Sequence, residues 1–274
     1  MLQPVLSTRP KEALPRYLSL CQQHGANPEV VVQAATESLA HLGGTHQRRV
    51  LTEHTVALMA RWYASIASGA PDWTVYDGDA YLGELWACWV AYSRSYLRSM
   101  QAAHLLPGQQ PLMAALGQVQ HIADLGCGIG YTTAALREIF PSAVVYGTNL
   151  DRTRQMQIAR TMALQHRFLM TSSLTAIPAP VDLVFASEYF EHFPAPVDHL
   201  RDVLRVLQPR ALLIANAFTA RAIGHFPTYL IEGQPLAGRL TAREFNRTLV
   251  GAGYRKIKTS LWNNRPTLWL QTAR

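Results

Sequence analysis

The sequence predicts an α/β fold in which a helical N-terminal region precedes a parallel β-sheet. Three observations support this prediction. Residues 9–118 read as helical throughout, with apolar residues at helical spacing between capping and helix-breaking residues. From about residue 121 onward, short apolar strands alternate with helices, which is typical of a parallel sheet. Near the C-terminus, the short polar turn at residues 263–265 separates two strands and indicates a hairpin.

Four helices are expected in the N-terminal region. They cover residues 11–24, 28–43, 45–68 and 79–104. Glycine or proline residues follow the last three and are expected to end each helix. The fourth helix is rich in aromatic residues, and Trp86, Trp89 and Tyr96 recur at helical spacing. That spacing favours a stripe of side chains that faces the core.

A glycine-rich strand end is the most informative feature of the chain. An apolar strand reaches Asp124, and three glycines then follow at every second position, Gly126, Gly128 and Gly130. Glycines at such a place let the backbone turn sharply and let a ligand lie against bare main chain. The helix predicted from about Tyr131 would direct its N-terminal N–H groups at that ligand. The spacing differs from the G-x-G-x-x-G of dinucleotide-binding loops.

The segments that follow continue the alternation of strands and helices. A second strand covers residues 143–151, so that strand, helix and strand span about thirty residues, as in a βαβ unit. A further apolar strand at 181–188 leads into Tyr-Phe-Glu-His-Phe at 189–193. A helix at 197–207 and a strand at 211–217 come next.

Together these motifs resemble the class I (Rossmann-like) S-adenosylmethionine-dependent methyltransferases. The family's motif I pattern, its spacing to the second strand and its E-H run after the fourth strand are all present in residues 119–274. The resemblance implies a seven-stranded Rossmann-like sheet of order 3-2-1-4-5-7-6 whose last strand pair is antiparallel. It implies two domains, a helical lid or substrate region at 1–118 and a cofactor-binding methyltransferase domain at 119–274.

The resemblance also implies S-adenosylmethionine as the cofactor. Asp124 is expected to help hold the methionine amino group, and the glycines to make room for the methionine part. The family usually places an acid on the ribose, but this chain has Asn149 there, with Asp151 as the fallback. The expected cofactor-binding residues are Asp124, Gly126, Cys127, Gly128, Gly130, Tyr131, Asn149, Leu150, Asp151, Ser172, Ser187 and Glu188.

Methyl transfer from a sulfonium is an in-line displacement, so the enzyme's chief task is to position the acceptor. A hydroxyl or amine acceptor can also need a general base. Because the fourth strand of this fold ends near the methyl group, we expect Tyr189, Glu191 and His192 to be the catalytic residues. The E-H pair also has a structural interpretation, since it often caps the next helix in the family.

Two segments are candidates for substrate binding. The aromatic helix at 79–104 could cover the cofactor cleft, with Tyr92 and Arg94 as contacts, instead of facing only the core. The segment at 218–240 is rich in apolar residues and is expected to form a partly buried lid or pocket wall. It contributes His225 and Tyr229 as substrate-binding candidates.

Composition limits the alternatives. The net charge of +7 invites a nucleic-acid partner, but only 16% of the residues are charged and the arginines are dispersed. The three cysteines are too few and too scattered for a disulfide framework or a zinc site, so no metal is expected. No apolar run is long enough to cross a membrane and no signal peptide is evident, so a cytoplasmic location is expected.

Three functions remain open at this stage. The first is O- or N-methylation of a small-molecule acceptor, and the second is methylation of a nucleic acid or modified nucleotide. The third is a non-catalytic role as a cofactor-binding or scaffold subunit, which the atypical Asn149 would permit. A relative of the lipid cyclopropanation enzymes is a minor variant, although no membrane-binding helix supports it. The oligomeric state is not predicted.

Overall fold

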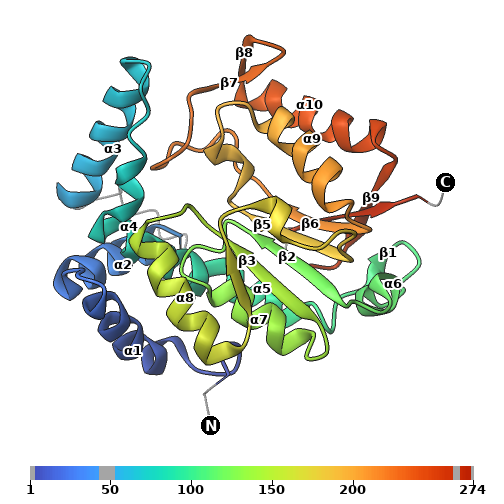
Figure 1. The fold of residues 1–274 in the computed structure, drawn as a ribbon, viewed down its shortest axis with the longest axis horizontal. Helices are drawn as coiled ribbons and strands as arrows, with labels where there is room; N and C mark the ends of the chain where they lie inside the picture. Colours follow the sequence, from blue (N-terminus) through green and yellow to red (C-terminus); the bar gives the residue numbers. More distant parts are fainter. Residues whose placement is uncertain (1–3, 43–52, 262–265, 273–274) are drawn as a thin grey trace.

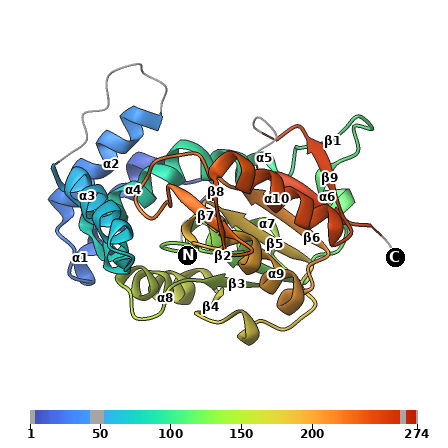
Figure 2. The same ribbon diagram turned by 90° about the horizontal axis from the view of Figure 1, so that it is seen from above.

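The computed structural model describes residues 4–42, 53–261 and 266–272. The first part of the chain is mainly helical. Its elements are α1 (Pro10–Gln23), α2 (Pro28–Leu42), α3 (Glu53–Ala67), the 3₁₀-helix η1 (Trp73–Asp77), α4 (Asp79–Cys88), the π-helix η2 (Trp89–Ser93), α5 (Arg94–Ser99), the strand β1 (Leu105–Leu106) and α6 (Leu112–Leu116). Helices α1 to α4 lie together at one end of the molecule in both views (Figures 1 and 2).

Each of the four predicted helices corresponds to described helical structure, although not in all its bounds, and α6 was not predicted. The first two match α1 and α2 closely, while part of the third, at residues 45–52, lies outside the described residues. The fourth was expected to be continuous to residue 104 but ends at Ser99 and contains a π-helical turn. The short strand β1 also shows that the region is not helical throughout.

The second part of the chain alternates strands and helices. Its strands are β2 (His121–Leu125), β3 (Val144–Thr148), β4 (Leu169–Thr171), β5 (Leu183–Ser187), β6 (Ala211–Ala215), β7 (Thr228–Ile231), β8 (Gln234–Ala237), β9 (Tyr254–Thr259) and β10 (Thr267–Gln271). Its helices are α7 (Tyr131–Ile139), α8 (Arg154–His166), η3 (Leu174–Ala176), η4 (Phe190–His192), α9 (Pro196–Leu207) and α10 (Gly238–Gly251). Strands β7 and β8 form a separate antiparallel hairpin within the predicted wall segment.

The main sheet confirms the expected fold class. Its order is β1-β9-β10-β6-β5-β2-β3-β4, and if β1 is set aside this is the predicted order 3-2-1-4-5-7-6. Strands β9 and β10 are antiparallel, as predicted. The predicted count of seven strands is wrong by one, because β1 pairs antiparallel with β9 and covers what would otherwise be an open sheet edge.

Alternate residues of the central strands face opposite sides of the sheet. Ile122 and Phe185 pack in one core cluster with residues of α4 to α8, whereas Leu125 and Val184 pack in another with α9 and α10. Figure 1 shows these two layers, with α9 and α10 on one side and α7 and α8 on the other. The first cluster also contains residues of α1 and α2, so the N-terminal helices and the sheet share one core. The division into two domains stays a prediction.

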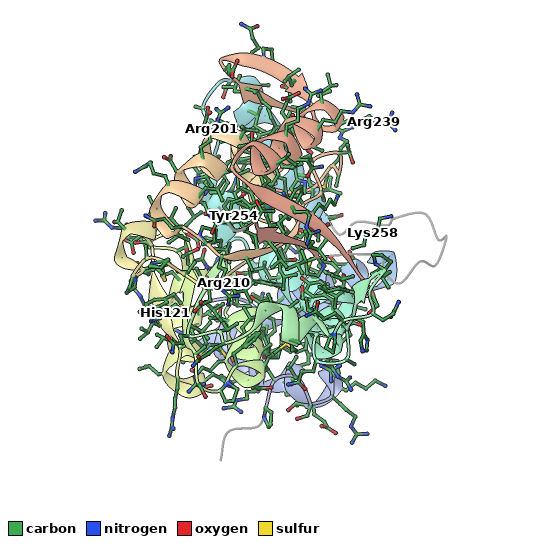
Figure 3. The ribbon with its side chains drawn as sticks, turned by 90° about the vertical axis from the view of Figure 1, so that its right-hand side faces the viewer. His121, Arg201, Arg210, Arg239, Tyr254 and Lys258 are labelled. Carbon is green, nitrogen blue, oxygen red and sulfur yellow. The ribbon has the colours of Figure 1, made fainter. Side chains whose placement is uncertain are left out.

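Basic side chains are spread over several elements on the face shown in Figure 3. Arg201 lies on α9, Arg239 on α10 and Lys258 on β9. Arg201 pairs with Asp198 at 2.7 Å. This arrangement agrees with the dispersed charge inferred from the sequence, and a nucleic-acid partner stays a prediction. No helix in the described part of the chain has the length and apolar character needed to span a bilayer.

Arg154, the first residue of α8, ties the sheet region to the turn before α4. Its guanidinium pairs with Asp79 at 2.7 Å and donates to the carbonyls of Asp77 and Gly25. The backbone N–H of Arg154 also donates to the Asp77 carboxylate at 2.8 Å. The turn at residues 77–79 is therefore anchored by α8.

We predict that Arg154→Ala lowers the free energy of unfolding by about 1–3 kcal/mol, because several partly buried charge-assisted hydrogen bonds are lost together. Arg205→Ala is a matched control, since Arg205 forms an exposed salt bridge with Asp202 and its loss should cost under about 1 kcal/mol. Urea denaturation of both variants checks the difference. Equal losses would show that Arg154 is an ordinary surface arginine.

Candidate active site

A cavity of about 640 Å³ lies where the carboxyl ends of β2, β3 and β5 meet the N-terminal helices. Its volume is ordinary for a small-molecule site. The glycine loop after β2, the residues that follow β3 and β5, the helices α4 and η2, and residues 220–225 all contribute to its walls. Segments that are far apart in the sequence therefore meet around one space.

The glycine loop is fixed against β3 by its own backbone. The N–H groups of Gly126 and Cys127 donate to the hydroxyl and the carbonyl of Thr148, at 3.1 and 3.0 Å. Gly126 has a φ of +66°, and a Cβ atom there would collide with the ring of Tyr189. Glycine is needed at this position for both its backbone conformation and its missing side chain.

Asp124 is buried beneath this loop with only 1% of its surface exposed. The hydroxyls of Thr132 and Thr133 both donate to its Oδ2 atom at 2.6 Å. Burial raises the pKa of Asp124 to about 7, against the opposing effect of the two threonine hydrogen bonds. A buried carboxyl group that lines the cavity and titrates near neutrality is suited to bind a cationic amino group.

Asn149 takes part in holding the loop. Its side-chain amide donates to the carbonyl of Gly128 at 2.6 Å, and its Oδ1 accepts from the N–H of Leu150 at 2.8 Å. A carboxylate could not make the first of these bonds, because it has no hydrogen to donate. Asp151 does not line the cavity and lies 3.7 Å from Arg160 at the surface. Of the two ribose candidates, only Asn149 lies at the cavity.

The aromatic helix faces both the core and the cavity. Trp86 and Tyr96 are almost fully buried in the core cluster, as the helical spacing predicts. Tyr92 lines the cavity from η2. Arg94 does not line it, because its guanidinium points away and donates to the carbonyl of Thr8 at 2.9 Å. A π-helical turn shifts the residues after it around the helix axis, and such turns are frequent at functional sites.

A dense set of polar groups follows β5. Glu191 is fully buried, and its Oε1 accepts from the N–H of Ala217 at 2.6 Å. Burial, and next the negative charge of Glu188, raise the pKa of Glu191 well above its ordinary value. Tyr189 packs on the glycine loop, and its hydroxyl lies 2.8 Å from Nε2 of His199.

Two histidines face each other across the cavity wall. Nδ1 of His192 lies 2.8 Å from the hydroxyl of Tyr76, and the rings of His192 and His225 are perpendicular at 4.8 Å. Nδ1 of His225 donates to the carbonyl of Ala220 at 3.1 Å. Burial lowers the pKa of His225 to about 4 and that of His192 well below its ordinary value. Both imidazoles are therefore neutral at pH 7.

The structure gathers most of the predicted site residues around the cavity. Those that line it are Asp124, Gly126, Cys127, Gly128, Tyr131, Asn149, Leu150, Ser172, Ser187, Glu188, Tyr189, His192, Tyr92 and His225. Those that do not are Gly130, Asp151, Glu191, Arg94 and Tyr229. Tyr229 is buried behind the wall, where its hydroxyl donates to the carbonyl of Glu191 at 3.3 Å. The roles of these residues stay predictions.

Sequence reasoning missed several residues that line the cavity. Tyr76 is one of them, and its hydroxyl contacts His192, which lies 116 positions further along the chain. Glu84 and Arg221 line the cavity from α4 and from the segment before β7. None of these residues belongs to a motif, so only the fold could bring them to the site.

Comparisons with known proteins agree with this geometry. Residues 123–215 match the profile of a family described as "Methyltransferase domain". This stretch contains the glycine loop after β2 and the polar residues that follow β3 and β5. The matched residues form a methyltransferase domain of the class I S-adenosylmethionine-dependent type. The family prediction from the sequence is thereby confirmed, and S-adenosylmethionine is the cofactor.

Curated relatives of this methyltransferase include the trans-aconitate 2-methyltransferase of Azoarcus sp. (strain BH72). It is 37% identical over 94 residues, which are 34% of this chain and 36% of that relative. The chain thus spans little more than a third of the length of this relative.

Two solved structures share the fold. An O-methyltransferase family protein from Burkholderia thailandensis is 13% identical with a TM-score of 0.51, covering 93% of this chain and 72% of that one. A candidate O-methyltransferase from Nostoc punctiforme PCC 73102 is 15% identical with a TM-score of 0.50, covering 87% of this chain and 72% of that one.

The cavity of this methyltransferase fits the cofactor by its own chemistry. Asp124 offers a carboxyl group for the amino group of the methionine part, and Gly126 and Gly128 line the same cavity. Asn149 and Leu150 lie at the end of β3, where the ribose is expected. The cofactor, when bound, supplies an electrophilic methyl group on its sulfonium, and these residues would hold and orient it.

We predict that cofactor affinity falls as the pH falls below 7. Asp124, with its pKa of about 7, is an ionised partner for an ammonium group above that pH and a neutral one below it. Titration calorimetry with S-adenosylhomocysteine should show up to about tenfold weaker binding at pH 6 than at pH 8. Asp124→Asn should bind weakly at both pH values. An unchanged pH dependence in that variant would contradict the assignment.

We also predict that Gly126→Ala costs more stability than Gly69→Ala. Both glycines have positive φ angles, +66° and +75°, so alanine is strained by about 1–2 kcal/mol at either. Only at Gly126 must a neighbouring ring also move, because nothing lies within 4 Å of a Cβ at Gly69. Thermal or urea unfolding should give an additional loss of at least about 1 kcal/mol for Gly126→Ala.

Proposed function

We propose that this methyltransferase transfers a methyl group to oxygen or nitrogen of an aromatic small molecule that carries no negative charge. The charge of the cavity carries the proposal. The described residues that line the cavity include four carboxyl groups and a single guanidinium. No lysine is among these described lining residues. The carboxyl groups are Glu37, Glu84, Asp124 and Glu188, and the guanidinium is that of Arg221.

An anionic acceptor would be repelled by such a wall. Arg221, its cationic residue, lies over the ring of Tyr63 at 5.2 Å, so part of its charge already faces a partner. The remaining wall contains several aromatic side chains, which offer ring faces for stacking. The aromatic lining residues outside the glycine loop include Trp73, Tyr76, Tyr81, Trp89, Tyr92 and Phe193.

The name of the Azoarcus relative points to a different acceptor. Trans-aconitate carries three carboxyl groups, and a pocket for it would need several cationic side chains. The identity to that relative extends over only 94 residues, whereas α4 and η2, which line much of this cavity, lie outside the matched family region. We therefore carry over the cofactor chemistry and not the acceptor.

Methyl transfer needs the attacking atom to be in line with the sulfonium methyl group, and the shape of the cavity performs this alignment. A hydroxyl acceptor also has to lose its proton. We assign this role to His192, which lines the cavity and is neutral at pH 7. Nε2 of His192 can accept a proton only if Nδ1 carries the single N–H hydrogen of the neutral ring. Tyr76 is then the positioning residue that accepts this hydrogen.

Acceptor identity is tested by incubating the protein and S-adenosylmethionine with a panel of small molecules and measuring methylated products by mass spectrometry. The panel should contain neutral phenols, aromatic amines and trans-aconitate. We expect products from the neutral or cationic aromatic members and none from trans-aconitate. Methylation of trans-aconitate would contradict the charge argument. Methylation of an added oligonucleotide would favour the nucleic-acid alternative.

The role of His192 is tested with a phenolic acceptor identified in that panel. His192→Gln should lower kcat by about 10²–10⁴-fold, which is the usual contribution of a general base. Tyr76→Phe should lower kcat less, because the imidazole remains but its tautomer is no longer selected. The affinity for S-adenosylhomocysteine serves as the internal control and should be unchanged in both. If kcat rises to the native value at high pH only in the glutamine variant, the base assignment holds.

A further inference from the structure

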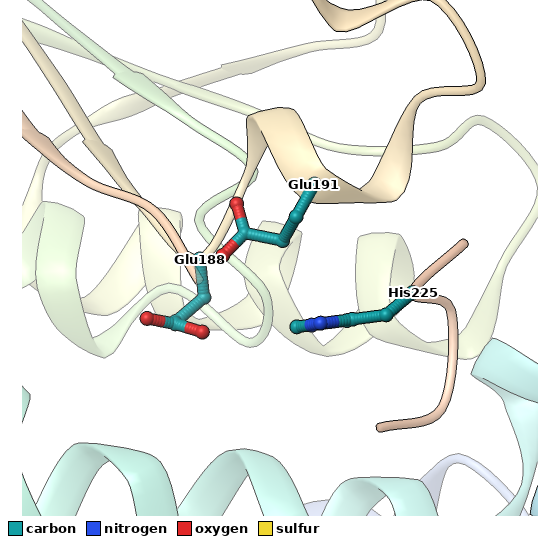
Figure 4. Close-up of side chains that lie close together, drawn as sticks. All are labelled: Glu188, Glu191 and His225. Atoms are coloured by element: carbon teal, nitrogen blue, oxygen red, sulfur yellow. The ribbon is translucent and has the colours of Figure 1, made fainter. Parts of the chain in front are cut away.

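Three potential metal ligands converge after β5 and β6. Glu188 follows β5, Glu191 lies in η4, and His225 lies in the segment before β7. One ligand atom from each lies within 4.8 Å of the other two. Figure 4 shows the two carboxyl groups and the imidazole directed at a common space. Ligand bonds of about 2.0–2.2 Å place two ligands of one ion up to about 4.4 Å apart, so small side-chain adjustments would close the set.

Glu191 gives an independent reason to expect a cation there. Its side chain is fully buried, and its Oε1 is satisfied by the N–H of Ala217 at 2.6 Å. Its Oε2 is also buried but has no hydrogen-bond partner. A buried carboxylate oxygen without a partner is costly, and a bound cation would remove that cost.

His225 is prepared to act as a ligand. Only 3% of its surface is exposed, and Nδ1 lies 3.1 Å from the carbonyl of Ala220. Because a carbonyl can only accept, Nδ1 carries the hydrogen and Nε2 of the neutral ring keeps its lone pair. Metal-binding histidines are commonly oriented by such a hydrogen bond from the other ring nitrogen.

We propose that Glu188, Glu191 and His225 bind one divalent first-row transition metal ion. Two carboxylates and a neutral imidazole match the charge of a divalent cation, and this mixed oxygen and nitrogen set suits Mn²⁺, Fe²⁺ or Zn²⁺. No metal was expected from the sequence, because the three cysteines are too few and too scattered for a zinc site. The helix α9 and the strand β6 separate Glu191 from His225, so no recognisable ligand spacing indicates this set.

The position of the site gives the ion a role. Glu188 and His225 line the same cavity as His192, so the remaining coordination positions would face the acceptor. An acceptor hydroxyl bound to a divalent ion becomes more acidic and is fixed in place. This role depends on the proposed methyl transfer, whereas binding of the ion does not.

The test is a titration of the full-length protein, freed of metal by a chelator, with MnCl₂ alone. Free Mn²⁺ is followed by its electron paramagnetic resonance signal, in the absence of cofactor and acceptor. We expect one ion per chain, and at least tenfold weaker binding in Glu191→Gln and in His225→Gln. Glu37→Gln, which changes another carboxyl group of the cavity, is the matched control and should bind Mn²⁺ as the native protein does.

Each outcome has a defined meaning. Absence of stoichiometric binding, or equal loss in Glu37→Gln and Glu191→Gln, would overturn the site. A parallel titration with S-adenosylhomocysteine shows that each variant is folded. Failure to bind Mn²⁺ while the cofactor still binds would refute the metal site and leave the proposed methyl transfer standing. Retained Mn²⁺ binding without any methylated product would support the metal site and refute the proposed methyl transfer.

Discussion

Packing around Tyr131 joins the two halves of the molecule. This residue begins α7, directly after the glycine loop, and its ring contacts those of Trp86, Trp89 and Tyr17 at centroid distances of 5.5, 5.2 and 6.2 Å. The loop that faces the cofactor and the helices that cover it therefore rest on the same side chains. Aromatic pairs of this kind contribute about 0.5–1.5 kcal/mol each beyond the area that they bury. The shape of the cavity depends on this contact.

The cavity combines an acidic wall with histidines that burial keeps neutral. Asp124 and Glu191 are both almost fully buried, and both have raised pKa values. Buried acids are held ionised only by a partner of opposite charge. At one end of the site that partner would be the amino group of the cofactor, and at the other a metal ion.

Local patterns predicted the parts of the structure that depend on neighbouring residues. The helix after the glycine loop has the expected bounds, from Tyr131 to Ile139, because the glycines, the strand and the helix lie within one short segment. The order of the sheet also followed, since the family resemblance fixes it. The additional strand β1 was not predicted, because two residues carry no periodic signal.

Long-range contacts could not be predicted in the same way. The hydrogen bond between Tyr76 and His192, and the approach of His225 to Glu188, join residues that no motif relates. Arg94 was expected at the site from its helix alone, but its long side chain turns toward Thr8 instead. Helical spacing defines the face of a residue, whereas the direction of a flexible side chain depends on its surroundings.

The amide of Asn149 restricts which residue its own position can hold. The acid that the family usually carries there would bring charge to the ribose but would place a carboxylate against the carbonyl of Gly128, which now accepts the amide hydrogen. A carboxylate has no hydrogen to donate, so aspartate would remove one contact in making another. The loop and the asparagine are thus matched to each other, and the energetic effects of changing both are expected not to be additive.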